Sequence, residues 1–527
     1  MLYNIYLEPV AQAIRDDPKI IGIAVPGGDD NIASHFADDG AFLLSVLTCL
    51  HAFFYIFERF RLATGSTVNM TKTKGIRIGE PRWDDPYLGH VLWQDLKEGL
   101  KVLGVYFFNT FKKTQDQNWT KVIKSVKEHA NIMKQRALSF KGKVLILNTV
   151  ILSKLWYLAT VISMTPDHET QIKKIIFEYL WGSTYNLISN ETAYQPKDRG
   201  GLAIKSPLLQ QMALQLKFFK YITDSTDRSN WLTLPRYWLG YHLAALLPHW
   251  SFLRSNMVPK LDTPMNTIAL GFTKRQKRPK YYEALFAQLK MVDVANASWL
   301  THDFYVEFLL KRYEPPKAYI EHWSFHRYDH SQIWRFVYLT MSEGRHQDVH
   351  FRYLHIKLPT LYLMKKNNKA AGKYHSNMVT ACMHCPMRTE NQYHVMQGCT
   401  KAKPIWNYVY PTLSLILRTY SYKLPDLICG KFPPGVNESK KKMVLTVIQI
   451  TMHCIWMNRN SFLKGDPNPP TRRGTECIIL KSFHRAMLVK FMEFYPDKID
   501  KFKKLYCHTP RVCRFNSNTE QLITEII

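Results

Sequence analysis

Hydrophobic and polar positions along this chain predict helices over most of its length. Apolar residues recur every three or four positions in Leu2–Ile14, in Leu43–Leu62 and from Trp119 to Ala137, which is the spacing of an amphipathic helix. We expect the second of these helices to stop at Thr64-Gly65, because glycine readily adopts the left-handed conformation that ends helices. The helical pattern continues in two further segments, residues 143–161 and 171–181.

Extended segments are predicted mainly near the N-terminus. Two apolar runs are separated by Asp39-Gly40, a dipeptide that favours the positive backbone angles of a tight turn, so we expect a hairpin with Asp38 and Asp39 at its tip. A second, short strand pair is expected over Lys101–Phe108, with Gly104 at a place where two backbones approach closely. The predicted fold class is therefore α+β and predominantly helical.

Two parts of the chain are harder to assign. Residues 182–205 read as a loop containing Arg199-Gly200-Gly201, and residues 207–330 are aromatic-rich, interrupted by prolines and without an evident function. The basic run Lys274–Arg278 inside the latter is expected to be an exposed loop. At 527 residues the chain is long enough for roughly three or four domains at about 150 residues each.

Charge is distributed unevenly. The whole chain carries a formal charge of +29, which favours a polyanionic partner such as nucleic acid. The first 60 residues instead hold eight acidic and three basic residues, a net charge of −5, so the other 467 carry +34. An acidic patch on a basic body suits a metal-dependent enzyme acting on nucleic acid, although a generic basic protein with an acidic edge has the same composition.

The chain lacks the features of a secreted or membrane protein. Nine cysteines are too few for a disulfide scaffold and indicate a reducing, intracellular compartment, with nucleus and cytoplasm not distinguished. We find no signal peptide after Met1. The two most apolar stretches, Val144–Ile162 and Met443–Met457, are interrupted by polar residues and are expected to be buried helices rather than membrane spans.

The most specific chemical signal is Cys382-x2-Cys385-x8-His394-x4-Cys399. A CxxC turn places two thiolates on one side of a tetrahedral ion, and a following His and Cys complete a four-ligand site. Such a site has no open position, so the predicted zinc is structural. His375 and His384 are not expected to be ligands, and the looser group Cys507, His508 and Cys513 is interpreted as ordinary residues.

Several basic residues are candidate nucleic-acid contacts. Lys124, Lys127 and Lys134 flank the apolar stripe of the helix that follows Trp119, where they could face either a phosphate backbone or plain solvent. Aromatic and basic residues also precede the cysteine cluster, an arrangement that suits single-stranded nucleic acid as well as a core with a basic rim. That set comprises Trp334, Arg335, His350, Phe351, Arg352, Lys365 and Lys366.

The order of the motifs resembles the palm of a LINE-type, non-LTR retrotransposon reverse transcriptase. Phe36-Ala37-Asp38-Asp39, Thr64–Thr73 and Leu103-Gly104-Val105 are similar to that family's motif C, D and E regions in turn. Leu138–Lys143, which contains Lys141, followed by Leu147–Ile151, resembles its thumb-side segment.

Later segments extend the resemblance. Arg199-Gly200-Gly201-Leu202 is similar to the glycine pair that follows the thumb, and Leu354–Thr360 with the cysteine cluster looks like the family's zinc-binding domain. Ile455–Asn460 fits what often follows that domain. The resemblance implies an incomplete palm at 1–110, a helical thumb at 111–206, a helical connector at 207–330, a zinc-binding region at 331–410 and a helical tail at 411–527.

The resemblance also implies site roles. Asp38 corresponds to the metal-binding carboxylate of motif C, Asp39 to its less directly coordinating neighbour, and Lys72 to the lysine that approaches the leaving pyrophosphate. The alternative for Lys72 is a solvated loop lysine. The parental reaction would be RNA-directed DNA synthesis with Mg²⁺, using an RNA template and a DNA primer or target.

The chain departs from the family in one decisive respect. Such polymerases hold two metals about 3.5 to 4 Å apart with carboxylates from separate strands, and the strand with the second aspartate, motif A, would lie upstream of Met1. We therefore expect the chain alone not to polymerise. The alternatives are a non-catalytic, zinc-containing nucleic-acid-binding protein derived from such an element, or a decayed element without function; the oligomeric state is not predicted.

Overall fold

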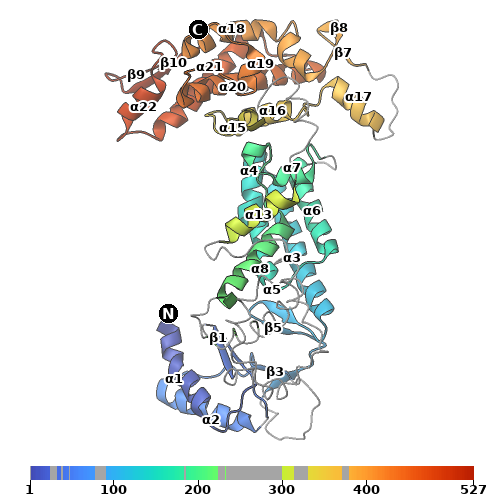
Figure 1. The fold of residues 1–527 in the computed structure, drawn as a ribbon, viewed down its shortest axis with the longest axis vertical. Helices are drawn as coiled ribbons and strands as arrows, with labels where there is room; N and C mark the ends of the chain where they lie inside the picture. The colour runs from blue at the N-terminus through green and yellow to red at the C-terminus, as the bar shows by residue number, and fades with distance from the viewer. Residues whose placement is uncertain are drawn as a thin grey trace. The chain divides into compact units, whose positions relative to one another are not determined.

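The computed structural model describes residues 2–23, 32–36, 39–46, 48–76, 91–182, 186–223, 300–313, 330–370 and 379–527, together with Ser229, Leu232 and Pro235. Helices dominate these residues, and the strands among them form five two-stranded sheets (Figure 1). The predominantly helical α+β class is thus confirmed. The chain divides into two compact units, one of 1–129, 152–173 and 206–310, the other of 130–151, 174–205 and 311–527.

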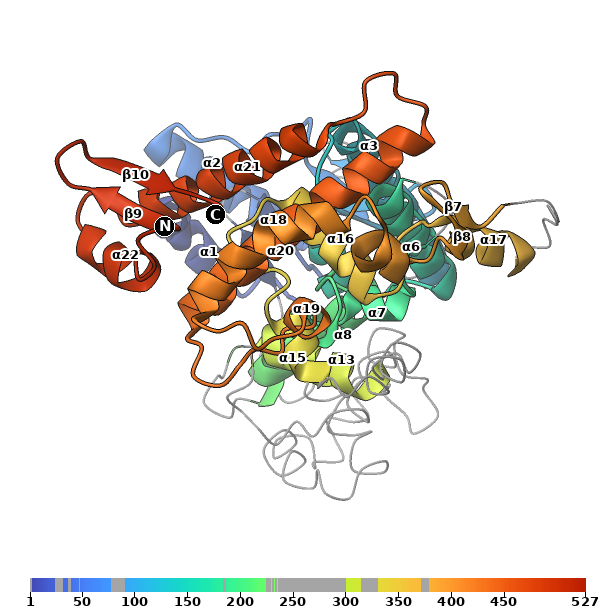
Figure 2. The same cartoon turned by 90° about the horizontal axis from the view of Figure 1, so that it is seen from above.

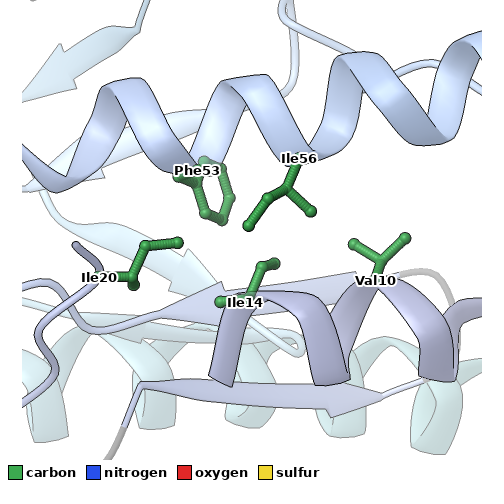
Figure 3. Packing of buried hydrophobic residues seen from close by; sticks show 5 residues of the cluster. All are labelled: Val10, Ile14, Ile20, Phe53 and Ile56. Carbon is green, nitrogen blue, oxygen red and sulfur yellow. The ribbon is translucent and has the colours of Figure 1, made fainter. Parts of the chain in front are cut away.

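The N-terminal part of the first unit packs two helices against each other. Helix α1 (Leu2–Asp16) confirms the predicted Leu2–Ile14 helix, and α2 (Cys49–Thr64) lies across it. Figure 3 shows the apolar contact between them, to which the segment after α1 adds Ile20. Its buried members are Val10, Ile14, Ile20, Phe53 and Ile56.

The limits of α2 test the sequence prediction at both ends. The helix stops at Gly65, whose φ of 77° and N–H bond to the Arg61 carbonyl at 2.7 Å confirm the predicted stop. Its start was predicted wrongly, since α2 begins at Cys49 and not at Leu43. The Leu43 N–H instead donates to the Ile32 carbonyl at 2.8 Å, which commits this segment to extended structure.

The predicted hairpin is present, but its turn is displaced. Strands β1 (Ala33–Phe36) and β2 (Asp39–Phe42) are antiparallel, and Phe36 pairs with Asp39. Asp39-Gly40 therefore lies inside β2 and not in the turn. Residues 37 and 38 join the strands and lie outside the described residues, so the predicted place of Asp38 is not described. Phe42 packs on Phe53 of α2, with ring centroids 4.5 Å apart.

The remaining strands of the first unit are short. Strand β3 (Lys74–Ile76) pairs in parallel with β4 (Leu92–Gln94), and β5 (Leu100–Val102) forms a hairpin with β6 (Val105–Phe107). The second pair confirms the predicted strand pair. Gly104 has a different role from the one predicted, because it occupies the hairpin turn with a φ of 87°, and a Cβ there would meet only Tyr157 at 3.8 Å.

A long helix follows this hairpin. In α3 (Phe111–Lys134) the side chain of Asn118 both accepts from the Tyr106 N–H at 2.9 Å and donates to its carbonyl at 2.7 Å, which fastens the helix to β6. The predicted apolar stripe is buried at Ile123, Val126 and Ala130, whereas Ala137 lies beyond the helix and is exposed.

The predicted helical segments after α3 are present with interruptions. Residues 143–161 fall in α4 (Phe140–Ile146), a π-helical turn (Leu147–Ile151) and α5 (Ser153–Val161). Helix α6 (Pro166–Trp181) is followed by a segment predicted as loop that contains the short α7 (Asn190–Tyr194). The described part of 207–330 is helical, in α8 (Pro207–Thr223) and α13 (Thr301–Arg312), and the basic run Lys274–Arg278 lies outside the described residues.

Membrane-spanning potential is limited. Within the described ranges no single helix is long and apolar enough to cross a membrane. One bent pair, Phe140–Ile151 with Ser153–Val161, reaches the required length and apolar composition, with an angle of 42° between its halves.

The second unit is organised around α20 (Glu438–Leu463), which is buried over Met443–Trp456 except at His453. Helices α16 (Gly344–Leu354), α18 (Lys403–Leu417) and α21 (Arg472–Met492) pack against it (Figure 2). This unit also contains the helices α15 (His330–Arg335), α17 (Leu361–Ala370), α19 (Leu424–Ile428) and α22 (Ile499–Tyr506), and the hairpin of β9 (Cys513–Asn516) and β10 (Gln521–Thr524).

The aromatic and basic residues before the cysteine cluster separate by burial. Trp334, His350 and Phe351 are buried, whereas Arg335 and Lys365 are exposed. This arrangement favours the interpretation as a core with a basic rim, because a stacking platform for bases needs accessible rings.

Candidate metal centre

The cysteine cluster begins at a tight hairpin. Strand β7 (Ala381–Cys382) pairs with β8 (Cys385–Thr389), and Cys382 lies opposite Cys385 in the register. A two-residue connection of this kind brings the two sulfurs to the same end of the hairpin. A π-helical turn, His394–Gly398, then carries the histidine, and Cys399 follows it with its N–H bonded to the His394 carbonyl at 2.7 Å.

These elements bring the four predicted ligands together. One ligand atom from each of Cys382, Cys385, His394 and Cys399 lies within 4.8 Å of the others, and the sulfurs of Cys382 and Cys399 are 3.9 Å apart. Four ligands at a tetrahedral zinc with bonds of about 2.3 Å to sulfur have sulfurs about 3.8 Å apart. The donor set and its spacing therefore fit zinc.

The histidine is oriented for this role. The His394 backbone N–H donates to Asn391 Oδ1 at 2.9 Å, which helps to start the π-helical turn. The Nε2 atom of the His394 ring is buried and has no hydrogen-bond partner within the described part of the chain. Burial, followed by the nearby Arg388, lowers the pKa of His394, which favours the neutral imidazole that a metal requires.

The thiols differ in their surroundings. The hydroxyl and N–H of Thr400 lie 3.4 Å and 3.5 Å from the Cys385 sulfur, and these contacts lower the pKa of that thiol. Burial raises the pKa of Cys399 to about 11. Bringing Cys399 to the thiolate form therefore needs a nearby positive charge, which a bound cation supplies.

A buried ion pair supports the loop between the ligands. Glu390 is 1% exposed and accepts from Arg459 of α20, which is 8% exposed. Its carboxylate also accepts from the Leu361 N–H at 3.0 Å, at the start of α17. The pair joins the metal-ligand loop to two helices. Sequence reasoning missed Glu390 and Arg459 as a pair, because nothing local relates residues 69 positions apart.

Two histidines were predicted not to be ligands. The His384 ring packs edge to face on Phe462, with centroids 4.6 Å apart, and does not belong to the four-residue group. His375 lies outside the described residues. In the second, looser cysteine group the sulfurs of Cys507 and Cys513 are 3.9 Å apart, and no disulfide joins any of the nine cysteines, all of which are described.

Of the predicted polymerase residues, Asp39 and Lys72 belong to the described part of the chain and Asp38 lies outside it. Asp39 is exposed at the start of β2, and Lys72 is exposed in a turn where its N–H donates to the Asn69 carbonyl at 3.0 Å. Across the described ranges, the cysteine and histidine group is the one cluster of three or more such side chains that could hold a metal. The roles of Asp39 and Lys72 stay predictions.

The predicted nucleic-acid contacts differ in accessibility. Lys124, Lys127 and Lys134 are exposed on α3, and Lys141 is exposed near the start of α4. Lys143 is half-buried and donates through Nζ to the Leu180 carbonyl at 2.8 Å, near the C-terminus of α6. Burial lowers its pKa. Lys143 thus has a structural partner that the sequence does not reveal.

Comparison with known proteins adds one relationship. No family model matches the chain. It is similar to the Transposon TX1 uncharacterized 149 kDa protein of Xenopus laevis, with 22% identity over 238 residues. This relative is a transposon protein. The match covers 44% of this chain and 18% of that protein, so the chain spans less than two thirds of the relative's length.

Proposed function

We propose that this chain is a zinc-containing nucleic-acid-binding protein derived from the reverse transcriptase of a non-LTR retrotransposon. The observation that carries the proposal is the convergence of Cys382, Cys385, His394 and Cys399, the site that the family resemblance implies. The similarity to a transposon protein and the charge of +29 support the same origin and the same class of partner.

In this proposal the zinc is structural. Its four protein ligands leave no open position for a substrate, and when bound it holds the β7–β8 hairpin to the π-helical turn. The ion pair of Glu390 and Arg459 then connects that loop to the long helix α20. Zinc binding would therefore stabilise the surface around the cluster without taking part in a reaction.

Metal analysis of purified variants tests the zinc. We expect about one zinc per chain in the wild type and a substantially lower content in Cys385→Ser and His394→Ala, because each loses one of four ligands. Cys477→Ser, which removes an exposed cysteine outside the group, and His384→Ala are the matched controls and should keep the metal. Equal zinc in Cys385→Ser and Cys477→Ser would contradict the assignment.

Helix α3 is the proposed contact with the phosphate backbone. Its Trp119, Ile123 and Val126 are buried, which fixes the orientation of the helix. Lys124 and Lys127 remain exposed on it and Lys134 follows further along. Cations held on an ordered helix can contact successive phosphates, whereas long side chains on loops must first be ordered.

Binding without catalysis is the activity we propose for the chain itself. A polymerase needs carboxylates from separate strands to hold two metals. Asp39 belongs to no group of three or more possible metal ligands among the residues that the structure describes. The RNA template and the DNA primer or target of the parental enzyme remain the partners that this proposal implies.

Salt-dependent binding of single-stranded RNA tests the proposed contact. Each phosphate contact adds about −0.7 to the slope of log K against log salt for a single strand. Lys124→Glu with Lys127→Glu should therefore make the slope less negative by roughly 1.4. Lys501→Glu with Lys504→Glu, exposed residues of α22, changes the net charge equally and should keep the wild-type slope. Asp39→Asn should bind normally.

Two results would contradict the proposal. Equal slopes for both double variants would show that α3 makes no specific contribution to binding. Magnesium-dependent primer extension by the purified chain, abolished by Asp39→Asn, would show a polymerase instead.

A further inference from the structure

A cavity of about 620 Å³ lies beside the metal-ligand loop in the second unit. It is bounded by the β7–β8 connection, the residues after Cys399, the C-terminal half of α20 and the start of α21. Its volume lies within the roughly 300 to 1,000 Å³ of small-ligand sites. The predicted zinc ligands Cys382 and Cys399 lie on one side of it, and from there the cavity extends to α20 and α21, with no lysine of α3 in its lining.

One wall of the cavity combines an aromatic ring with a cation. Phe462 contributes its ring, against which His384 packs, and the Lys401 ammonium lies 5.8 Å from the ring centroid. Aromatic rings accompanied by cations are the surfaces on which nucleic-acid bases stack, because every base has a flat π face.

Another part of the lining is electropositive. Helix α21, 21 residues long, starts at the cavity with Arg472 and has no acidic residue in its first turn. Its N-terminus therefore carries the positive end of the helix dipole. Arg472 is 64% exposed and pairs with Glu476 through Nε at 2.8 Å.

A buried donor gives independent evidence for a ligand here. Arg459 lines the cavity and is 8% exposed, with one terminal nitrogen bonded to Glu390 and the other to Asn460 Oδ1 at 2.9 Å. Its Nε is buried without a hydrogen-bond acceptor anywhere in the described residues. Buried donors are normally satisfied, so this N–H calls for an acceptor that the protein does not supply.

We infer that this cavity binds a single nucleotide, with its base against Phe462 and its phosphate at Arg472 and the N-terminus of α21. Arg459 Nε is covered by neighbouring atoms in the free chain, so its donation to an oxygen of the ligand requires a shift of the Arg459 side chain on binding. Two ligands share this chemistry: a free nucleoside monophosphate and an unpaired nucleotide within a strand. The second deepens the proposed nucleic-acid binding and rests on it, whereas the first does not.

Titration calorimetry with adenosine 5′-monophosphate tests the site in the full zinc-loaded chain. Loss of the ring in Phe462→Leu should weaken binding about tenfold, as base stacking does when an aromatic residue is removed. Arg472→Gln should weaken it by a similar factor. Arg473→Gln, the exposed neighbour that does not line the cavity, is the matched control and should bind like wild type.

Two further probes separate the parts of the ligand. Adenosine should bind more weakly than the monophosphate and should respond to Phe462→Leu but not to Arg472→Gln. Inorganic phosphate should show the reverse pattern. No heat of binding from millimolar adenosine 5′-monophosphate, or equal affinities in Phe462→Leu, Arg472→Gln and Arg473→Gln, would overturn the inference. Unchanged zinc content and circular dichroism confirm that each variant folds.

Competition identifies the source of the nucleotide. Displacement of the monophosphate by a twelve-nucleotide single strand assigns the site to a strand, and undisturbed binding in the presence of that strand assigns it to a free nucleotide. The variant Lys124→Glu with Lys127→Glu should keep wild-type affinity for the monophosphate. Failure of the α3 proposal and failure of the cavity proposal are therefore distinguishable.

Discussion

At the scale of single residues, the second unit buries histidines that must stay neutral. His346 is 2% and His350 is 1% exposed, both on α16. His350 Nε2 lies 2.8 Å from the Ile428 carbonyl and its Nδ1 lies 2.9 Å from Gln449 Nε2. Because the amide nitrogen can only donate, Nδ1 accepts and Nε2 carries the proton. A second proton would place two donors against each other.

Burial accordingly depresses the pKa of these groups. The pKa of His346 falls to about 3, with a further contribution from the adjacent His453, and those of His350 and His453 fall to about 4. Burial has the opposite effect on Asp348, whose pKa rises to about 6.

These shifts predict acid destabilisation. At pH values between the lowered pKa of these histidines and 6.5, the folded state binds fewer protons than the unfolded state. The free energy of unfolding that the neutral histidines contribute above pH 6.5 is therefore lost as the pH falls toward 4. Each histidine contributes at most about 1.4 kcal/mol per pH unit. Asp348 opposes this below about pH 6, because its raised pKa stabilises the fold as the pH falls, but it is one group against three.

Urea unfolding at pH 7 and pH 5 measures the effect. The variant His346→Phe keeps an aromatic ring beside His453 and removes one titrating group, so it should lose less stability than wild type between these pH values. Between pH 8 and pH 7 the histidines are mainly neutral in both the folded and the unfolded state. The free energy of unfolding should therefore change by the same amount in wild type and variant. An unchanged pH 7 to pH 5 difference in the variant would contradict the assignment.

At the scale of elements, some boundaries depend on partners far away in the chain. Ser139 caps the N-terminus of helix α4: its hydroxyl accepts from the Gly142 N–H at 3.3 Å, a local signal for a helix start. The Phe140 N–H in the same turn donates to the carboxylate of Asp348 at 3.0 Å, and Asp348 lies 208 positions later in the chain. Only the folded second unit supplies that acceptor.

The turn between β5 and β6 gives a prediction at this scale. Leu103 and Gly104 have φ values of 46° and 87°, as a two-residue hairpin turn requires, and leucine is poorly suited to a positive φ. Leu103→Asn should raise the free energy of unfolding by up to about 1 kcal/mol, and Gly104→Ala should lower it by about 1 kcal/mol.

Urea titration of both variants measures these opposite changes. The Tyr157 hydroxyl donates to the Leu103 carbonyl. Neither substitution removes this backbone oxygen, so both variants keep the hydrogen bond. Destabilisation by Leu103→Asn would mean that the leucine side chain, 44% exposed, stabilises more than its backbone strain costs.

At the scale of the whole molecule, the chain divides into two compact units, and the predicted zinc ligands all belong to the second. Calorimetry should therefore show two unfolding transitions. A zinc chelator should lower one transition by on the order of 10 °C, since structural zinc contributes several kcal/mol, and leave the other in place. Cys385→Ser should show the lowered transition without chelator and no further response. Equal shifts of both transitions in wild type would contradict this division.

Sequence reasoning succeeded where the physical cause is local. The stop at Gly65 follows from one residue's backbone freedom, and the buried stripe of α3 follows from helical periodicity. It failed at the start of α2, because the extended pairing of Leu43 with Ile32 overrides the helical pattern. It also misplaced the turn of the first hairpin, where strand register placed Asp39 in β2.

By itself, the sequence determined the helical character, the excess of positive charge and the four candidate zinc ligands, since all of these depend on residue type and short spacing. Only the tertiary structure decided which side chains are accessible. It assigned Lys143 to the Leu180 carbonyl, paired Glu390 with Arg459 and left the Arg459 Nε without an acceptor among the described residues. Burial and partnership arise from contacts between distant segments, and no local pattern of residues encodes them.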